Sequence, residues 1–379
     1  MTLRTSLLSI AVLAGLTLAV GAGASEGHLG LPPLPVPADN PMSAEKVALG
    51  EKLFNDKRFS STGQVACATC HAAATGFTDS PRSVSVGIEG KTGTRNAPTV
   101  LNAAYSTSMF WDGRSPSLED QALHPFLNPV EMALPSHDPI LKVVRGDGDY
   151  KKQFKAVFGV SGDAITMDHV TGAIAAFERT LVTGSSPFDR WFYGGEADAM
   201  TAQQIEGYKL FIGKARCESC HVIEQTSATF SDNRFHNIGV GVNRIQGDIP
   251  ELAGKFLDAE LTQSQVDVAV LTDPRSSELG RFAVTTTFDG LGAFKTPTLR
   301  NVTLTAPYMH DGSIATLRKV VEHYNNGGVT NKGDPVNDFL SGGIRPLNLT
   351  EPEIDAVVAF LEALTSPMPA STPAQPGAK

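Results

Sequence analysis

The chain has 379 residues, of which 41% are hydrophobic, and a formal net charge of −9. This length predicts roughly two domains, and the apolar fraction is sufficient for two ordinary hydrophobic cores. Because the sequence contains no basic block, nucleic acid is not expected as a partner. A mildly acidic surface suits a basic or neutral protein partner instead.

The N-terminus has the pattern of an export signal. Arg4 is followed by an apolar stretch over residues 7–20, and Ala22-Gly23-Ala24 then forms a small-x-small cleavage site. We therefore predict a signal peptide over residues 1–24, cleavage near Ala24-Ser25 and a periplasmic mature protein. The alternative is a membrane anchor, but the apolar stretch is short for a span and no charged stop follows it. No later segment is long enough either, so the mature protein is not expected to span a membrane.

Two segments have compositions typical of irregular chain. Residues 25–41 are rich in proline and predict an extended linker or surface strap. Residues 367–379 are rich in Pro, Ala and Ser and predict a disordered tail.

A weak internal repeat lies between these segments. Helical stretches over residues 42–54 and 200–211 each lead to a Cys-x-x-Cys-His sequence. Ser43 can cap the first helix, and Thr201 with Gln204 forms a capping box for the second. The repeat predicts two related domains, over residues 42–190 and 191–366.

The remaining strong patterns are also helical. Helices are expected to start at residues 117–121, to cover residues 167–181, and to follow the capping box Thr350-x-x-Glu353. Long alternating patterns typical of β-strands are absent, and residues 76–96 and 236–300 are expected to form Gly-rich loops. The sequence predicts a mainly α fold with long loops.

The four cysteines of the chain all lie in two copies of the c-type haem attachment motif. The motifs are Cys67-Ala68-Thr69-Cys70-His71 and Cys217-Glu218-Ser219-Cys220-His221. A redox pair or a zinc site is the alternative, but a redox pair does not need the adjacent histidine. We therefore expect one covalently bound haem c in each of two cytochrome c-like domains, with His71 and His221 as the proximal iron ligands.

The function then depends on the opposite side of each iron. Residues 72–108 contain neither His nor Met, which favours an open distal side at the first haem. His124 is a weak candidate ligand, because it lies within a helical pattern and such histidines are more often structural. For the second haem the candidates are His236, Met309, His310, His323 and Tyr324, and composition does not choose among them.

Longer motifs resemble the bacterial di-haem cytochrome c peroxidases and their relative MauG, over roughly residues 42–365. In the first half these are Arg95-Asn96-Ala97-Pro98-Thr99-Val100, Phe110-Trp111-Asp112-Gly113-Arg114, Gln121-x3-Pro125 and Pro129-Val130-Glu131-Met132. In the second half they are Lys295-Thr296-Pro297-Thr298-Leu299-Arg300-Asn301 and Pro307-Tyr308-Met309-His310-Asp311-Gly312.

The resemblance implies roles for four residues near the first haem. It identifies Glu131 with the distal acid–base group and Gln121 and Pro125 with its pocket companions. Cleavage of peroxide needs a group that moves a proton from the inner oxygen to the outer one, and one carboxyl can make both transfers. Trp111 matches the tryptophan between the two haems and is expected to relay electrons. The alternatives are a solvated surface charge for Glu131 and a core aromatic for Trp111.

The resemblance also implies a calcium ion between the haems. Asn96, Thr305 and Pro307 match that site, the latter two through their backbone carbonyl oxygens.

Two departures from the peroxidase pattern place the chain closer to the MauG-like branch. Tyr324 stands where the peroxidases have a methionine ligand and where MauG has a tyrosine. The displaceable histidine that peroxidases usually carry after the first haem is missing. An oxygen donor favours oxidised iron, whereas a thioether favours reduced iron. Met309 is the main rival ligand, followed by His310, and Tyr324 has the alternative role of a core aromatic.

A third departure concerns the exit of oxidising equivalents. MauG has a relay tryptophan six residues before its second haem histidine, whereas this chain has Ala215 there. The chain has two tryptophans, Trp111 and Trp191, so a partner would be oxidised by way of Trp191 or a tyrosine. The substrate can therefore differ from that of MauG. A related subgroup associated with methanobactin genes resembles the chain equally well and oxidises a tryptophan of a partner protein.

The sequence thus supports three hypotheses. The preferred one is a MauG-like enzyme that uses hydrogen peroxide to oxidise residues of a partner protein through a high-valent di-haem state. The second is a cytochrome c peroxidase that reduces peroxide to water with electrons from a small cytochrome. The third is a non-enzymatic di-haem electron carrier, which requires both irons to be closed.

Overall fold

The computed structural model describes residues 28–258, 261–329 and 336–369. The predicted signal peptide and most of the predicted tail lie outside these residues. The described chain is mainly helical, and its one sheet pairs β1 (Phe235–His236) with β2 (Phe294–Lys295) in antiparallel register. No helix in the described ranges has the length and hydrophobicity needed to cross a membrane. The helices are α1 (Ala44–Phe54), α2 (Cys67–Cys70), α3 (Leu118–Gln121), α4 (His124–Leu127), α5 (Asp138–Gly146), α6 (Gly148–Phe158), α7 (Met167–Glu178), α8 (Pro187–Phe192), α9 (Ala202–Ile212), α10 (Ile249–Leu257), α11 (Gln263–Thr272), α12 (Pro274–Ser277), α13 (Phe282–Thr285), α14 (Leu317–Asn325) and α15 (Glu351–Glu362).

The predicted helix starts are confirmed by their caps. The Ser43 side chain accepts a hydrogen bond from the backbone of Lys46 at the start of α1. Thr201 and Gln204 form a capping box at α9, and Thr350 forms one with Glu353 at α15. Each cap satisfies backbone N–H groups that have no partner within the helix.

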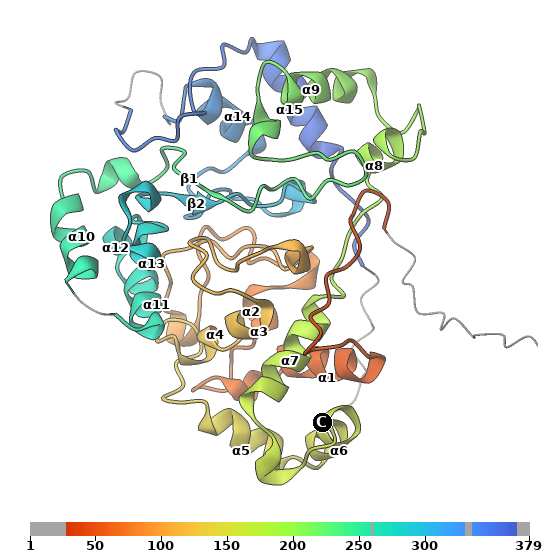
Figure 1. Ribbon diagram of the computed structural model, residues 1–379, viewed down its shortest axis with the longest axis vertical. Helices are drawn as coiled ribbons and strands as arrows, with labels where there is room; N and C mark the ends of the chain where they lie inside the picture. Colours follow the sequence, from red (N-terminus) through yellow and green to blue (C-terminus); the bar gives the residue numbers. More distant parts are fainter. Residues whose placement is uncertain (1–27, 259–260, 330–335, 370–379) are drawn as a thin grey trace, which may run out of the picture.

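The internal repeat is visible in the packing of the long helices. In the lower half of Figure 1, α1 crosses α7, and in the upper half α9 crosses α15. A Cβ atom at Gly50 would lie 1.9 Å from the carbonyl oxygen of Ala173, and one at Gly207 would lie 1.9 Å from that of Ala356. Both crossings therefore require glycine, because any side chain would collide with the backbone of the partner helix. The two halves are cytochrome c-like units, each with its own apolar core.

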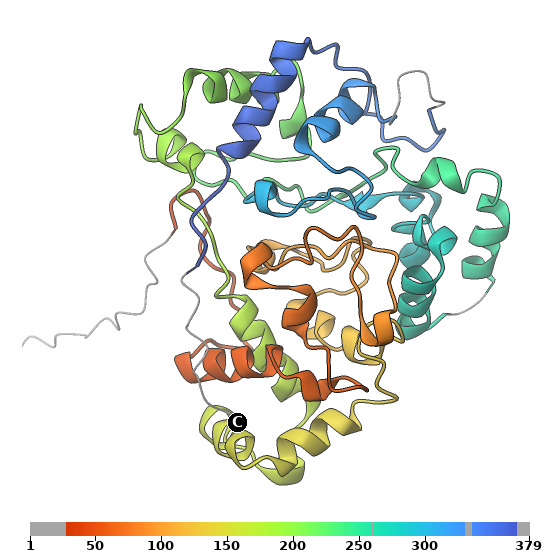
Figure 2. The ribbon, with the colours of Figure 1, turned by 180° about the vertical axis from the view of Figure 1, so that it is seen from behind.

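A third apolar core lies beside the two haem-motif halves. Helices α10 to α13 pack around Leu252, Val270, Leu279 and Phe282, which are buried, and Figures 1 and 2 show this group at one side of the molecule. The prediction of a loop over residues 236–300 was therefore wrong for this part. The helices here are short, from four to ten residues, so each carries too little apolar periodicity to be recognised alone.

The loops that join the two halves repeat one another closely. Asn102 and Asn301 both adopt left-handed backbone conformations before a 3₁₀ turn, with φ of 60° and 58°. Phe110 and Met309 follow at the same spacing, with φ of 64° and 76°. Within that register, Trp111 of the first half corresponds to His310 of the second.

Reciprocal hydrogen bonds connect these loops across the interface. The backbone N–H of Asn96 donates to the carbonyl of His310 at 2.8 Å, and the N–H of Lys295 donates to the carbonyl of Trp111 at 2.7 Å. The two halves therefore face each other with approximate two-fold symmetry, and Asn96 corresponds to Lys295.

The N-terminal part of the described chain runs along this interface as a strap. The carbonyl of Gly30 accepts a hydrogen bond from the buried guanidinium of Arg300 at 2.7 Å. The hydroxyl of Tyr105 donates to the carbonyl of Pro32 at 3.2 Å. The strap thus contacts both halves of the molecule.

Candidate haem site

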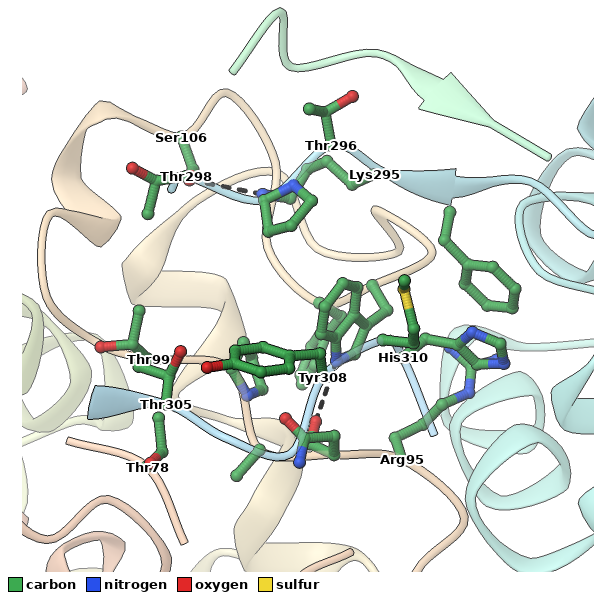
Figure 3. A pocket seen from close by; sticks show the side chains of 18 of the residues that line it. Thr78, Arg95, Thr99, Ser106, Lys295, Thr296, Thr298, Thr305, Tyr308 and His310 are labelled. Atoms are coloured by element: carbon green, nitrogen blue, oxygen red, sulfur yellow. Dashed lines mark hydrogen bonds between the residues drawn. The ribbon is translucent and has the colours of Figure 1, made fainter. Parts of the chain in front are cut away.

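One large cavity of about 810 Å³ extends between the two halves. Both Cys-x-x-Cys-His motifs line it, and Figure 3 shows part of its wall. Every residue that the sequence analysis assigned to a haem, to peroxide chemistry or to calcium also lines it. These residues are Cys67, Cys70, His71, Asn96, Trp111, Gln121, Pro125, Glu131, Cys217, Cys220, His221, Thr305, Pro307 and Tyr324.

Each of the two motif histidines contacts the backbone carbonyl of a phenylalanine. The Nδ1 atom of His71 lies 3.1 Å from the carbonyl oxygen of Phe77, and that of His221 lies 2.9 Å from the carbonyl oxygen of Phe230. Burial lowers the pKa of both imidazoles. An Nδ1–H that donates to a carbonyl leaves Nε2 free for iron and fixes the ring. The cysteines of both motifs are free thiols, so the residues fit two haem groups.

Glu131 lies in the cavity wall on the first-motif side. Its carbonyl accepts a hydrogen bond from the N–H of Ile88 at 3.0 Å, and a Cβ at Gly87 would lie 2.7 Å from that carbonyl oxygen. The loop after the first motif is therefore packed directly on the backbone of Glu131. Burial, together with the charge of Asp267, raises the pKa of the Glu131 carboxyl to about 7, although the guanidinium of Arg114 acts to lower it. A carboxyl with this pKa can both accept and donate a proton near neutral pH.

Gln121 and Pro125 lie in the same wall, on α3 and α4. The side chain of His124 is engaged outside the cavity. Its ring packs against Phe110 with a centroid distance of 5.4 Å, and its Nε2 lies 3.1 Å from the amide nitrogen of Gln263. His124 is not among the residues that line the cavity.

Trp111 and Asn96 are joined at the interface. The indole Nε1–H of Trp111 donates to the carbonyl of Asn96 at 2.8 Å, so the ring is held between the halves. The side-chain amide of Asn96 donates to the carbonyl of Ser83 at 3.0 Å. Its amide nitrogen is thereby engaged, and the amide oxygen is the atom left for a cation.

Tyr324 lies on α14 beside the second motif. Burial raises the pKa of its hydroxyl, and the neighbouring Cys217 and Cys220 raise it further. No residue in the described ranges forms a hydrogen bond with this hydroxyl. Tyr324 is partly buried and lines the cavity, so its phenol oxygen is available to a group that binds there.

Three of the four rival candidates have protein partners instead. His310 stacks on Phe294 at 3.7 Å and its Nε2 lies 2.9 Å from a carboxylate oxygen of Glu278. The Nε2 of His323 lies 2.7 Å from the carbonyl of Ile238. The Nε2 of His236 lies 2.8 Å from Asp232. Met309 lines the cavity as well. Tyr324 and Met309 are therefore the two candidate ligands whose side chains are not engaged in a hydrogen bond with the described chain.

An aromatic cluster connects the second motif with the surface. The ring of Phe230, whose carbonyl contacts His221, lies 5.4 Å from that of Phe188. Phe188 lies 5.9 Å from Tyr208, and Tyr208 lies 5.3 Å from Trp191. We call Phe188, Trp191 and Tyr208 the exit cluster.

The cavity wall also contains a glutamate that no sequence motif indicates. Glu178, at the end of α7, is buried, and one of its carboxylate oxygens has no partner in the described chain. Burial, together with the charge of Glu119, raises the pKa of Glu178 to about 8, although Arg179 acts to lower it. An isolated Glu in a helix gives no sequence pattern that reveals such burial.

Glu178 should make the stability of the protein depend on pH. The folded chain holds the proton up to a pH of about 8, whereas an ordinary Glu releases it near 4.5. The free energy of unfolding should therefore fall as pH rises between these values, by up to about 1.4 kcal/mol per pH unit. In Glu178→Gln this part of the slope should vanish, as measured by denaturant unfolding at several pH values. The exposed Glu206→Gln is the control, and identical slopes in Glu178→Gln and the parent protein would contradict the assignment.

Comparisons with known proteins agree with this site. The family model described as di-haem cytochrome c peroxidase matches residues 44–198. The cytochrome-c peroxidase IdrP1 of Denitromonas iodatirespirans is 38% identical over 99% of this chain and 97% of its own length. The methylamine utilization protein MauG of Methylorubrum extorquens is 38% identical over 87% of this chain and 81% of its own length.

Solved structures give the same result. A MauG-like protein associated with microbial copper homeostasis is 33% identical, with a TM-score of 0.72 over 90% of this chain and 95% of its own. The di-haem peroxidase BthA of Burkholderia thailandensis, 23% identical, shares the fold with a TM-score of 0.67 over 91% of this chain and 97% of its own. The chain is therefore a haem-dependent oxidoreductase that belongs to the di-haem cytochrome c peroxidase family, in which relatives named MauG and relatives named peroxidase are equally similar to it.

Proposed function

We propose that this chain is a MauG-like enzyme of the periplasm that uses hydrogen peroxide to oxidise residues of a partner protein, for example a tryptophan. The observation that carries the proposal is the hydroxyl of Tyr324, which faces the cavity beside Cys217 and Cys220 without a hydrogen-bond partner in the described chain. We propose that both haems are attached covalently through the four cysteines, and that His71, His221 and Tyr324 bind the irons.

The difference between the two distal sides supports this proposal. The spacing that relates Asn102 to Asn301 also relates Pro125 to Tyr324. Proline has no atom that can bind iron through its side chain, whereas the phenol oxygen can. One distal position is thus left vacant for peroxide and the matching position is filled.

The residues of the first distal site fit the proton transfers that peroxide cleavage needs. When bound, the haem groups would supply the redox chemistry that cleaves the O–O bond. Glu131 accepts the proton from the inner oxygen of the peroxide and donates it to the outer oxygen. The reaction then balances: hydrogen peroxide takes two electrons and two protons to give two waters, and the partner releases both electrons and both protons as its residues are oxidised.

The loop after the first motif supports activity without prior reduction. It contains no histidine, and Gly87 packs it against the carbonyl oxygens of Val130 and Glu131. Where this loop supplies no histidine ligand, no ligand has to be displaced before peroxide binds. We also propose a calcium ion held by the Asn96 amide oxygen and the carbonyls of Thr305 and Pro307.

The proposal is tested by adding hydrogen peroxide to the fully ferric protein. We expect an oxidised spectrum that persists long after mixing and that decays faster when a protein substrate is present. Rapid return to the ferric spectrum with no such species would refute the proposal.

Oxidising equivalents should leave through the exit cluster. We expect Trp191→Phe to decrease the tryptophan radical signal of the peroxide-treated protein by about tenfold or more, because phenylalanine is far harder to oxidise than indole. Freeze-quench EPR measures this signal, and the rate of peroxide consumption should stay unchanged. Tyr193→Phe is the matched control, since the Tyr193 hydroxyl lies beside the cluster but donates to the carbonyl of Glu224. An undiminished radical in Trp191→Phe would mean that the exit lies elsewhere.

A second candidate function is that of a cytochrome c peroxidase. It is favoured by relatives of that name, such as the cytochrome c551 peroxidase of Nitrosomonas europaea, which is 35% identical over 97% of this chain and 92% of its own length. Steady-state turnover with a reduced small cytochrome, at rates that require a half-reduced enzyme, would select this function over the first.

A further inference from the structure

Lys295 is an amine in the cavity wall without a countercharge. It lies on β2, and its Nζ donates to the hydroxyl of Ser106 at 3.4 Å, a long hydrogen bond. No carboxylate in the described ranges forms an ion pair with it. Burial lowers the pKa of its ammonium to about 8. Figure 3 shows Lys295 and Ser106 together on one side of the cavity.

The internal repeat gives this position a counterpart. The reciprocal backbone hydrogen bonds to His310 and Trp111 relate Asn96 to Lys295. The 3₁₀ turns after Asn102 and Asn301 end at Ser106 and Thr305, so these two residues also correspond.

The same register extends two residues further, where Ser108 corresponds to Pro307. The hydroxyl of Ser108 is buried and has no partner in the described chain. Lys295, Ser106 and Ser108 therefore form a second set, related by the internal repeat to Asn96, Thr305 and Pro307, with the two halves exchanged. The side chain of Asn96 is an amide with a free oxygen. The corresponding side chain of Lys295 already carries a positive charge.

We propose that, in the second set, the ammonium of Lys295 takes the place that a metal cation would have beside Asn96, Thr305 and Pro307. We propose further that this ammonium binds a carboxylate side chain of the haem at the second motif. An ammonium in the wall of this cavity is costly once water is excluded, unless an anion pairs with it. The haem carboxylates are the anions that the cofactor of this family brings into the cavity.

The location of Lys295 assigns it to the second haem rather than to the first. Lys295 pairs with Phe235 in the β1–β2 sheet, and the next residue, His236, has a ring nitrogen close to the thiol of Cys220. The sheet thus holds Lys295 next to the second attachment motif. This inference concerns the charge beside the second haem, so it stands or falls independently of the partner and of the peroxide reaction.

The test is the midpoint potential of the second haem in the holoprotein, measured by spectroelectrochemistry. A positive charge opposes loss of an electron from the haem. Lys295→Met should therefore lower the potential, by an amount equal to about a tenfold change in the oxidised-to-reduced ratio, the size expected for one charge-assisted hydrogen bond. Lys295→Arg should retain most of the original potential.

Two further variants separate charge from packing. Lys295→Gln keeps a polar side chain and should lower the potential as Lys295→Met does, and it replaces that variant if the latter fails to fold. Lys319→Met, which removes an exposed lysine of α14 paired with Glu322, should leave the potential unchanged. The proposal is overturned if both neutral variants keep the original potential, or if Lys295→Arg lowers it as far as they do.

Discussion

Replacing Glu131 with Gln should slow the reaction of the ferric protein with hydrogen peroxide by about 10²- to 10⁴-fold, the range that one positioned acid–base group contributes. Glutamine has nearly the same shape but cannot accept and return a proton. Both haems should remain attached and their resting spectra unchanged. Stopped-flow mixing with peroxide measures the rate.

The pH dependence of this rate should identify the same carboxyl. Because the pKa of Glu131 lies at about 7, the base form increases as pH rises through 7. The rate should therefore increase with pH below this value and level off above it, and the inflection should be lost in Glu131→Gln. Glu89→Gln is the matched control, because Glu89 lies on the neighbouring loop and its side chain is exposed. An unchanged rate in Glu131→Gln would rule out the acid–base role.

Replacing Tyr324 with Phe should remove the oxygen ligand of the second haem. We expect a change in the ferric spectrum of that haem and loss of the persistent oxidised spectrum after peroxide addition, since the second iron would no longer have a donor that favours its oxidised state. The lifetime of the oxidised spectrum should fall by at least about tenfold, a change of roughly 1.4 kcal/mol in the barrier to its decay. Optical spectra before and after mixing with peroxide measure both effects.

Tyr308→Phe is the matched control for this variant. Tyr308 lines the same cavity, but its hydroxyl donates to the carbonyl of Val302 at 3.1 Å. Its removal should leave the second haem spectrum as it is. If Tyr324→Phe behaves like Tyr308→Phe, Met309 becomes the preferred ligand.

The sequence was sufficient to predict the local features of the fold. Ser43, Thr201 and Thr350 start helices because capping is decided within four residues. The internal repeat was also detectable, because Gly50 and Gly207 stand at matching positions of two related helices. The short helices α10 to α13 were missed, since their stability comes from a shared core rather than from their own patterns.

The candidate site likewise has some features that the sequence could predict and others that it could not. The haem motifs could be identified from the sequence because the attachment chemistry requires a fixed local spacing. The environments of Glu131 and Glu178 could not, because burial by residues far along the chain raises their pKa values. Likewise, the correspondence between Lys295 and Asn96 depends on hydrogen bonds between the two halves that no local pattern encodes.

Low-temperature EPR of the fully ferric holoprotein tests the central claim most directly, namely that one iron is left open and the other is bound by the phenol oxygen of Tyr324. The account predicts one high-spin signal from the haem at His71 and one low-spin signal from the haem at His221, and only the latter should change in Tyr324→Phe. Two low-spin signals with nitrogen or sulfur donors on both irons would contradict it and would leave electron transfer as the function.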